Sequence, residues 1–298
     1  MDAALALRIG VDNGVPIAEC EAARSLQQSE LVTMLTSELV ESPLFYTWRI
    51  IALSEIPYAQ ELEYTKKLID RVCDKLSTPF GFSLSGDEKQ FLPCYNAMLV
   101  SAMCRLGYAK NETVLRAVEW INEYQPMGRG VDVSIPGLKF DRYGGCFKST
   151  PCYIGVAKSV FALFNHQQAM GDNSASEKLE AGIEYLLTHH LINKLHKNEP
   201  ITSHILDISF PESYHLNIVE LIRFAAEANL LGDTRAKAAI EHLQNVRTHE
   251  STWKVDFRYR STGYTVFDQG RKPSEWVTHI ISHALKGANR HLCHSSVG

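Results

Sequence analysis

The sequence predicts an all-α protein, and three observations lead to this prediction. Five prolines are each followed by an apolar run of helical length, and they lie 50, 58, 60 and 62 residues apart. The stretches between these runs contain helices with one apolar stripe and charges on the opposite side. No segment shows strand-like alternation over a useful length. A period of this kind indicates supersecondary units repeated along the chain.

The five apolar runs are the candidate inner helices. Proline fits the first helical turn, because an N–H group at that position would have no partner within the helix. Ser42 and Thr150, just before two of the prolines, are good N-caps. Because the runs are apolar around much of their circumference, we expect them to be buried. We expect inner helices to start near Pro43, Pro93, Pro151, Pro211 and Pro273.

Four amphipathic helices alternate with the inner ones, and a further helix precedes the first. Each shows a single apolar stripe, the pattern of a helix that covers a core from outside. Their sequences are "QELEYTKKLIDRVCDKLS", "ETVLRAVEWINEYQ", "SEKLEAGIEYLLTHHLI" and "TRAKAAIEHLQNV", with "ECEAARSLQQSELVTMLTSEL" before them. The remaining segments are connectors, of which "KVDFRYR" alternates and is compatible with a short hairpin.

Composition excludes several classes of function. Hydrophobic residues make up 45% of the 298 residues, and the net charge of −4 gives no electrostatic footprint for nucleic acid. No apolar stretch is long enough to span a membrane, and the first residues lack the features of a signal peptide, so we expect a cytoplasmic protein. Seven scattered cysteines favour reduced thiols over a disulfide framework.

Alternating buried and amphipathic helices have two stable arrangements, an open superhelix and a closed ring. An open solenoid needs polar terminal caps, yet the last inner helix still carries Trp276, Val277 and Ile280. The long period and the small number of pairs also favour the ring. We therefore predict an α/α toroid of about five to six helix pairs as one domain over 1–298, with mobile ends at 1–14 and 289–298.

The inner segments resemble those of a known superfamily. They include "LPCYNAMLVSAMCRLGYAKNETVLRAVEWINEYQ", "TPCYIGVAKSVFALF", "FPESYHLNIVELI" and "GRKPSEWVTHIISHALK". Over roughly residues 40 to 288 the chain is similar to the α/α toroids that include squalene-hopene cyclases and protein prenyltransferase β-subunits. It is most similar to short bacterial prenyltransferase or squalene-cyclase repeat proteins. The resemblance implies a terpene-cyclase-like or prenyltransferase-like enzyme that acts on a small hydrophobic or isoprenoid-like substrate in a hydrophobic cavity.

The chain departs from the catalytic motifs of these relatives. It has neither the Asp-x-Asp-Asp cluster of the cyclases nor the Asp-Asp-x-x-Asp motif of class I terpene synthases. The Asp-x-Cys zinc motif of protein prenyltransferases is absent as well. One fold hosts many reactions, so the family reaction does not carry over, and cyclisation, isomerisation and group transfer all stay open.

Cysteines near the starts of adjacent inner helices form a candidate zinc site. The repeat places Cys94 and Cys152 at equivalent positions, Cys146 lies in a glycine-preceded loop six residues earlier, and His215 lies near the same end of the next inner helix. Three thiolates and one imidazole suit a metal-binding, closed zinc site, or an open one if a thiol stays unbound. The alternative is that these cysteines are small buried hydrophobes or bare reactive thiols.

Two acids and six aromatic residues complete the candidate site. Asp207 and Glu212 are the candidate catalytic acids, because a carboxyl in an apolar cavity has a raised pKa; the alternative is stabilisation of a helix N-terminus. Aromatic rings suit an isoprenoid or a carbocation, although at helical spacing they also suit a plain core. The candidate substrate-binding residues are Tyr46, Trp48, Tyr95, Tyr153, Tyr214 and Trp276.

Two interpretations of the whole chain follow. In the first, an enzyme binds a small hydrophobic substrate, and zinc or a carboxylic acid drives the reaction. In the second, a non-catalytic toroid binds a ligand or a protein partner and holds a structural zinc. A lanthionine-cyclase-like toroid is a weaker third interpretation. Its zinc site would need an adjacent cysteine and histidine within the ring, and the adjacent pair in this chain, Cys293 and His294, lies outside the predicted ring. The sequence leaves the oligomeric state open.

Overall fold

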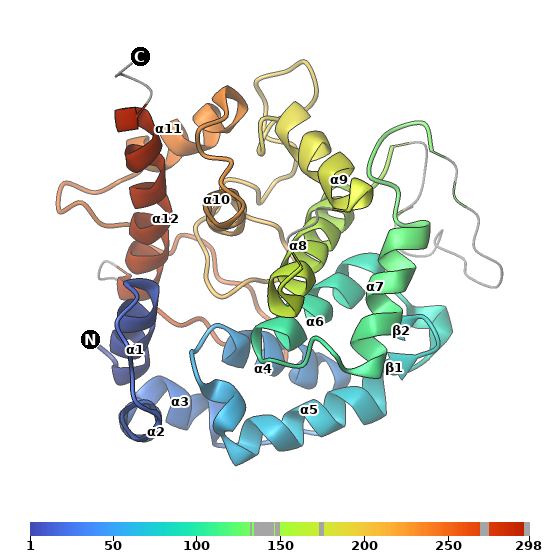
Figure 1. The fold of residues 1–298 in the computed structure, drawn as a ribbon, viewed down its shortest axis with the longest axis vertical. Coiled ribbons are helices and arrows are strands. Elements are labelled where there is room, and N and C mark those ends of the chain that lie inside the picture. Colours follow the sequence, from blue (N-terminus) through green and yellow to red (C-terminus); the bar gives the residue numbers. More distant parts are fainter. Residues whose placement is uncertain (132, 134–145, 147–149, 173–175, 269–273, 295–298) are drawn as a thin grey trace. The chain divides into compact units, whose positions relative to one another are not determined.

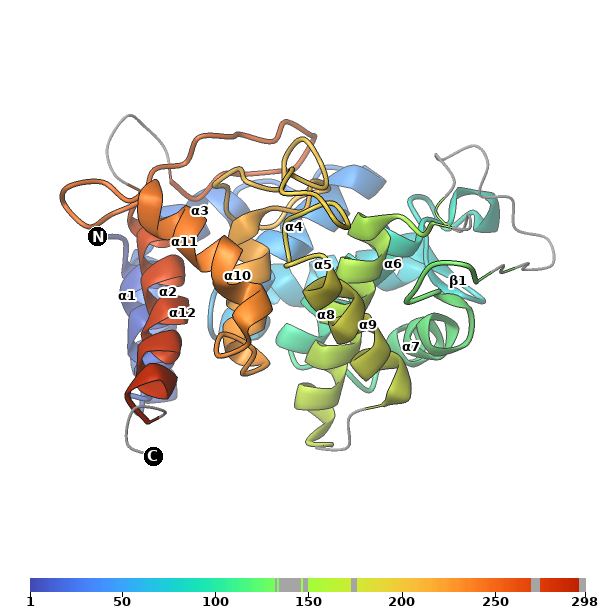
Figure 2. The ribbon, with the colours of Figure 1, turned by 90° about the horizontal axis from the view of Figure 1, so that it is seen from above.

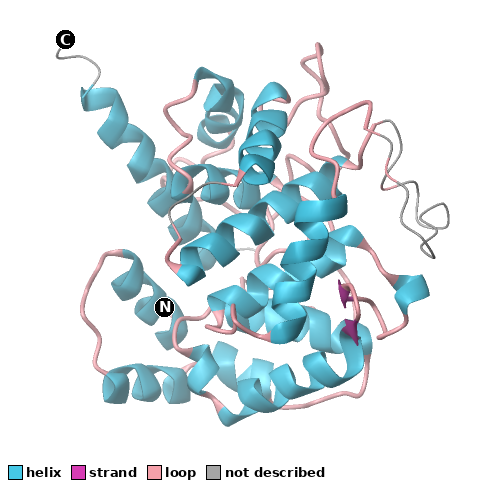
Figure 3. Cartoon of the chain, turned by 45° about the vertical axis from the view of Figure 1, so that its right-hand side comes forward, coloured by secondary structure: helices cyan, strands magenta, loops and turns pink. Residues whose placement is uncertain are grey.

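The structure is mostly helical, which confirms the all-α prediction (Figure 3). It is a computed structural model that describes residues 1–131, 133, 146, 150–172, 176–268 and 274–294. Within these residues lie twelve α-helices and one two-stranded sheet. None of the described helices combines the length and the apolar character that crossing a bilayer requires.

The chain divides into two compact units. Unit 2 comprises Asp2–Ile183 and Arg260–Thr265, and unit 1 comprises Met1, Glu184–Tyr259 and Val266–Gly298. The helices of unit 2 are α1 (Ala3–Asp12), α2 (Glu19–Gln28), α3 (Glu30–Thr36), α4 (Pro43–Ser54), α5 (Glu63–Leu76), α6 (Pro93–Arg105), α7 (Glu112–Tyr124) and α8 (Tyr153–Met170). The short antiparallel strands β1 (Ser77–Thr78) and β2 (Gly81–Phe82) also belong to it. Helix α9 (Glu177–Thr188) begins in unit 2 and ends in unit 1.

Unit 2 has an inner and an outer layer of helices. Helix α6 packs against α4 and α8, so these three form the inner layer (Figure 1). In α6 every residue except Arg105 is buried, whereas α5 and α7 bury only one stripe each, as their charged faces require. Helices α5 and α7 cover the inner helices α4 and α6 from outside. The apolar runs and the amphipathic helices therefore occupy different layers within this unit.

The starts of the inner helices agree with the proline positions only in part. Helices α4 and α6 begin at Pro43 and Pro93, and α8 begins two residues after Pro151. The expected start near Pro211 is wrong, because α10 begins at Ile218. Asn217 caps this helix: its side-chain oxygen accepts the backbone N–H groups of the second and third helical residues, at 2.9 and 3.2 Å. Pro273 lies outside the described residues.

A buried ion network joins the C-terminal ends of inner helices in unit 2. Glu55 follows α4, is 1% exposed, and accepts Arg105 Nη1 of α6 at 2.8 Å. Arg8 of α1 lies 3.5 Å from the same carboxylate and also pairs with Asp12 at 2.8 Å. Helix α1 occupies most of the range 1–14 that we predicted to be a mobile end, and its Leu5 is 1% exposed.

Unit 1 contains the end of α9 together with α10 (Ile218–Glu227), α11 (Lys237–Asn245) and α12 (Glu275–His294). Helices α10 and α12 lie side by side (Figure 2). The buried Trp253 follows α11, and its indole N–H donates to the Leu243 carbonyl at 2.8 Å. Ser274, just before α12, accepts the Val255 N–H at 3.0 Å. These contacts hold the start of segment 253–259, which forms one side of the candidate site.

Candidate functional site

Two irregular segments of unit 1, 201–217 and 253–259, form the framework of the candidate site. The Asp256 N–H donates to the Ile208 carbonyl at 3.1 Å, and the Ile208 N–H donates to Asp256 Oδ1 at 2.7 Å. The alternating sequence "KVDFRYR" forms no strand here, so the short hairpin is absent. Its alternation does appear in the burial, because Val255, Phe257 and Tyr259 are half-buried whereas Asp256, Arg258 and Arg260 are exposed.

His204 and Asp207 form a close hydrogen-bonded pair on segment 201–217. His204 Nδ1 lies 2.6 Å from Asp207 Oδ2, and the two side chains are 31% and 25% exposed. We assign the hydrogen of the neutral ring to Nδ1, because a carboxylate only accepts hydrogen bonds. The other ring nitrogen, Nε2, then carries a lone pair. A carboxylate-oriented imidazole that keeps contact with solvent is a suitable general base.

A second imidazole lies directly beside the first. The ring centroids of His215 and His204 are 4.1 Å apart, with the planes tilted by 38°. Phe257 contacts both rings, with centroid distances of 4.5 Å to His204 and 5.6 Å to His215. Tyr259 and Tyr214 make edge-to-face contacts with His215, with ring centroids 5.6 and 5.5 Å away. The aromatic rings give the two imidazoles an apolar wall.

A second carboxylate contributes to the electrostatics of the site. The pKa of Asp256 is raised, first by desolvation of its carboxyl and then by the negative charge of Asp207. The hydrogen bond from the Ile208 N–H opposes this shift in part. The Asp207 carboxyl therefore lies next to His204 on one side and interacts with a second acid, Asp256, on the other. Such a set can accept a proton at His204 and stabilise the resulting imidazolium.

The described residues do not assemble a metal centre. No group of three or more His, Cys, Asp or Glu side chains within them is arranged to hold a metal ion. The imidazole rings of His204 and His215 lie side by side, with centroids 4.1 Å apart and planes tilted by 38°.

Three of the four predicted zinc ligands come together in unit 2. The Cys152 N–H donates to the Cys146 carbonyl at 3.3 Å, and Cys94 interacts electrostatically with both thiols. The pKa of Cys94 is raised strongly, mainly by burial and then by the other two cysteines, and burial raises the pKa of Cys146 to about 11. The fourth predicted ligand, His215, belongs to unit 1. A thiol must lose its proton before it binds a metal or acts as a nucleophile.

The other sequence-predicted residues lie in several places. Glu212 is 3% exposed, on the same segment as His215. Trp48 packs against Tyr95 at 5.7 Å in unit 2, whereas Trp276 packs against Phe210 and Phe267 in the core of unit 1. Tyr46 and Tyr153 are buried, and the Tyr46 hydroxyl donates to Glu41. Of the six predicted aromatic residues, Tyr214 alone contacts an imidazole of the candidate site in the described contacts.

Four residues of the site carried no prediction from the sequence, namely His204, Asp256, Phe257 and Tyr259. His204 lies three residues before Asp207. Because the segment is irregular, no helical periodicity in the sequence indicated that the two side chains would meet. The alternation of "KVDFRYR" did place Phe257 and Tyr259 on one face, and this was the available signal. The pairing with segment 201–217 bridges 48 residues, from Ile208 to Asp256, and no local pattern reveals it.

Comparison with known proteins shows the fold alone. No family model matches the chain, and no curated protein matches it. Its structure is similar to the crystal structure of the Lin0763 protein from Listeria innocua, a target of the Northeast Structural Genomics Consortium. The TM-score is 0.52 and the identity 13%, with 98% of this chain and 85% of that chain covered. The likeness supports a shared fold and says nothing of the reaction.

Proposed function

We propose that the protein is an enzyme that acts on a small hydrophobic or isoprenoid-like molecule by acid–base catalysis, within an α/α toroid. The observation that carries the proposal is the 2.6 Å contact between His204 Nδ1 and Asp207 Oδ2, with the His215 ring 4.1 Å from that of His204. In this arrangement His204 Nε2 takes a proton from the substrate. Asp207 stabilises the imidazolium, and His215 contacts the reacting group from the neighbouring ring.

The strength of the base narrows the class of reaction. An imidazolium is a weak acid, so it does not suit the protonation of an isolated alkene that starts a cyclisation of the squalene-hopene type. A neutral imidazole does suit removal of a proton next to a carbonyl, and it suits activation of a hydroxyl or thiol for group transfer. Isomerisation and group transfer are therefore the favoured reactions among the three that the sequence left open.

The aromatic residues of the site support an apolar substrate. Phe257 contacts both imidazoles, and Tyr259 and Tyr214 make edge-to-face contacts with His215. Ring faces carry partial negative charge, so they favour a cationic or electron-poor centre in the bound molecule. Half-burial of Phe257 and Tyr259 leaves part of each ring available for contact with a ligand.

The test is an incubation of the purified protein in D₂O with a panel of isoprenoid alcohols, aldehydes and ketones, followed by mass spectrometry. We expect one of them to gain deuterium or to be converted, with loss of at least a hundredfold in rate in His204→Asn. Asp207→Asn should reduce the rate by a smaller factor, because the base remains but its orientation is lost. His249→Asn, an exposed histidine of the same unit, is the matched control.

The outcome separates catalysis from binding. Conversion that is equal in the wild type and in His204→Asn contradicts the proposed base. Saturable binding of an isoprenoid with neither exchange nor conversion supports the second interpretation, a toroid that binds a ligand without catalysis. Conversion that depends on His204 and is unchanged in His249→Asn supports the enzyme.

Zinc is a separate prediction, and no step proposed above uses it. The three thiols that come together are the observation in its favour. Elemental mass spectrometry of the purified protein tests it, with Cys94→Ser and Cys152→Ser as variants. About one zinc per chain, lost in both variants, supports a structural site; a folded protein without metal contradicts it.

A further inference from the structure

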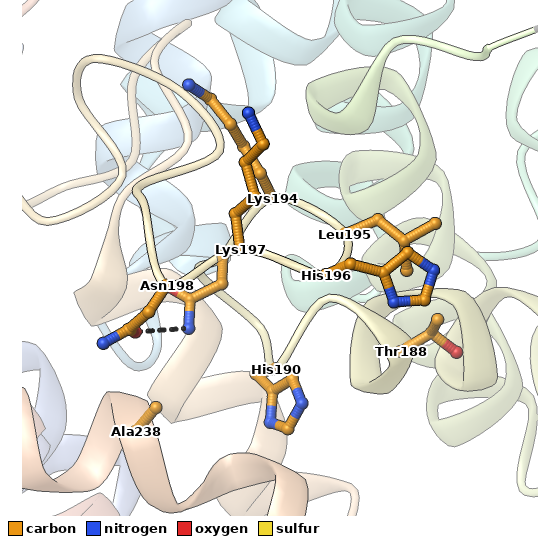
Figure 4. A pocket seen from close by; sticks show the side chains of 9 residues that line it. Thr188, His190, Lys194, Leu195, His196, Lys197, Asn198 and Ala238 are labelled. Carbon is orange, nitrogen blue, oxygen red and sulfur yellow. Dashed lines mark hydrogen bonds between the residues drawn. The ribbon is translucent and has the colours of Figure 1, made fainter.

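A surface pocket of unit 1 lies between the end of α9, loop 189–200 and α11 (Figure 4). The side chains of Lys194 and Lys197 extend away from His190 and Thr188. The polar groups of this pocket therefore do not converge on a ligand. In unit 2, by contrast, three side chains of reactive chemistry do come together, namely Cys94, Cys146 and Cys152.

The backbones of Cys146 and Cys152 lie next to each other. The Cys152 N–H donates to the Cys146 carbonyl at 3.3 Å. Cys152 has an extended backbone, with φ of −61° and ψ of 119°, and directly precedes α8. Residues paired by such a hydrogen bond between extended segments have Cα atoms about 5.5 Å apart. Disulfides join residues whose Cα atoms are about 4.4–6.8 Å apart, so this spacing suits a bond between the two sulfurs.

The third thiol is close to this pair but is held differently. Cys94 lies in the first turn of α6 and interacts electrostatically with the thiols of Cys146 and Cys152, which also interact with each other. Among the described residues, no backbone hydrogen bond joins Cys94 to either of them. Cys146 and Cys152 are therefore the pair whose geometry favours a disulfide.

The three thiols differ in their access to solvent. Cys152 is half-buried, whereas Cys94 and Cys146 are 5% and 8% exposed. Thiol–disulfide exchange begins when a thiolate reaches the sulfur of an incoming disulfide. Cys152 is therefore the thiol that meets an oxidant first, and Cys146 is the neighbour that can displace it.

We propose that Cys146 and Cys152 form a reversible disulfide by exchange with a low-molecular-weight disulfide such as oxidised glutathione. First, the Cys152 thiolate attacks one sulfur of oxidised glutathione, which forms a mixed disulfide and releases one glutathione as its thiolate. Then Cys146 loses its proton to solvent and attacks Cys152 Sγ, which forms the protein disulfide and releases the second glutathione. Two protein thiols are oxidised, and one glutathione disulfide is reduced to two thiols.

Burial of Cys146 affects the rate of this exchange. It raises the pKa of the Cys146 thiol to about 11, so the second step is the slower one. Excess reduced glutathione runs the same two steps backwards and restores both thiols.

The disulfide and the predicted zinc site exclude each other. Both use the sulfurs of Cys146 and Cys152, and a disulfide sulfur no longer has the thiolate charge that binds zinc. The disulfide shares no residue with the His204 pair, which belongs to unit 1. It therefore goes beyond the proposed function and does not depend on it.

Equilibration of the chelator-treated protein with reduced and oxidised glutathione at pH 8, followed by acid quenching, digestion and mass spectrometry, tests the proposal. We expect a linked peptide with Cys146 and Cys152 that is about 2 Da lighter than its two reduced halves together. The equilibrium constant for this bond should be at least tenfold larger in the folded protein than in the urea-unfolded protein, because folding already pairs the two residues. A tenfold difference corresponds to a gain of about 1.4 kcal/mol in the free energy of unfolding on oxidation.

Three cysteine positions serve as controls. Cys94→Ala should leave the equilibrium constant unchanged, and Cys146→Ser should stop at the mixed disulfide, with a gain of about 305 Da at Cys152. The exposed Cys20 should carry glutathione in every variant and so shows that the oxidant reacts. Three results overturn the proposal: a link that uses Cys94, an equilibrium constant no larger in the folded than in the unfolded protein, or a reduced Cys152 while Cys20 carries glutathione.

Discussion

The charged groups of unit 2 and those of the candidate site in unit 1 differ in what surrounds them. In unit 2, Glu55 is 1% exposed and its carboxylate is saturated by Arg8 and Arg105, which come from two other helices. At the site, the side chains of His204 and Asp207 are 31% and 25% exposed and lie on an irregular segment. The buried carboxylate of Glu55 and its two arginines join helices of unit 2. The His204–Asp207 pair is instead partly exposed, so a ring nitrogen of His204 is accessible to solvent. Changes in the first region should alter stability, and changes in the second should alter activity.

The largest effect is expected from Glu55→Ala. Removing the carboxylate leaves the two partly buried guanidinium groups without their shared partner, so the free energy of unfolding should fall by about 3–5 kcal/mol. Urea unfolding followed by circular dichroism measures it. Glu63→Ala is the matched control, because its side chain is 79% exposed and solvent screens its pair with Lys66, so its loss should change stability little. Equal effects of the two substitutions would contradict the role given to Glu55.

Gly263→Ala tests how tightly segment 260–265 packs on α4. Gly263 has φ of 85°, and an added Cβ would lie 2.5 Å from Phe45 Cα and 2.8 Å from its carbonyl oxygen. Strain and overpacking together should cost about 2–4 kcal/mol. Gly107→Ala has nearly the same φ, 83°, but open space around its Cβ, so it should cost about 1 kcal/mol. A difference of zero in urea unfolding would show that the segment is loosely held.

A smaller effect is expected at the cap of α10, the helix that follows the site. Asn217→Ala removes the acceptor of two backbone N–H groups and a 3.3 Å hydrogen bond to the Ser209 carbonyl, and should cost about 1–2 kcal/mol. Asn111→Ala, the cap of α7 with a single accepted N–H, should cost about half as much. A larger loss in Asn111→Ala would contradict the importance given to the Asn217 cap.

The smallest effect is expected from Asp256→Asn, and it depends on pH. The pKa of Asp256 is raised in the folded state, so the folded protein gains stability from the protonated form and loses this gain as pH rises through the folded pKa. Asparagine keeps the acceptor for the Ile208 N–H without the charge. The variant should therefore be more stable than wild type by a few tenths of a kcal/mol at pH 7, since solvent screens this exposed group. The difference should shrink as pH falls through the folded pKa and vanish well below the ordinary aspartate value of 3.8. A variant less stable than wild type at pH 7 would contradict the sign.

The layers of unit 2 were predictable because local chemistry determines them. Pro43 and Pro93 mark the starts of α4 and α6, where a missing N–H costs nothing, and the apolar stripes of α5 and α7 reveal which face is buried. The same rule failed at Pro211. There the side chain of Asn217 satisfies the first N–H groups of α10, and the helix begins after that cap.

The candidate site was predictable only in part. Asp207 and His215 were singled out, the first as an acid and the second as a zinc ligand, yet their partner His204 was not. The site depends on two irregular segments whose contact, between Ile208 and Asp256, joins positions far apart in the chain. Periodicity describes helices and strands, so it carries no information about such a contact.

The most direct test of the account is the tautomer of His204, read from the ¹⁵N chemical shifts of the ring by NMR above pH 8, in wild type and Asp207→Asn. The account predicts hydrogen on Nδ1 in the wild type, because Asp207 accepts it, and a shift toward the Nε2–H form in the variant. The peaks are assigned with His204→Asn. Hydrogen on Nε2 in the wild type would leave that nitrogen without the lone pair of a base and would contradict the proposed catalytic role.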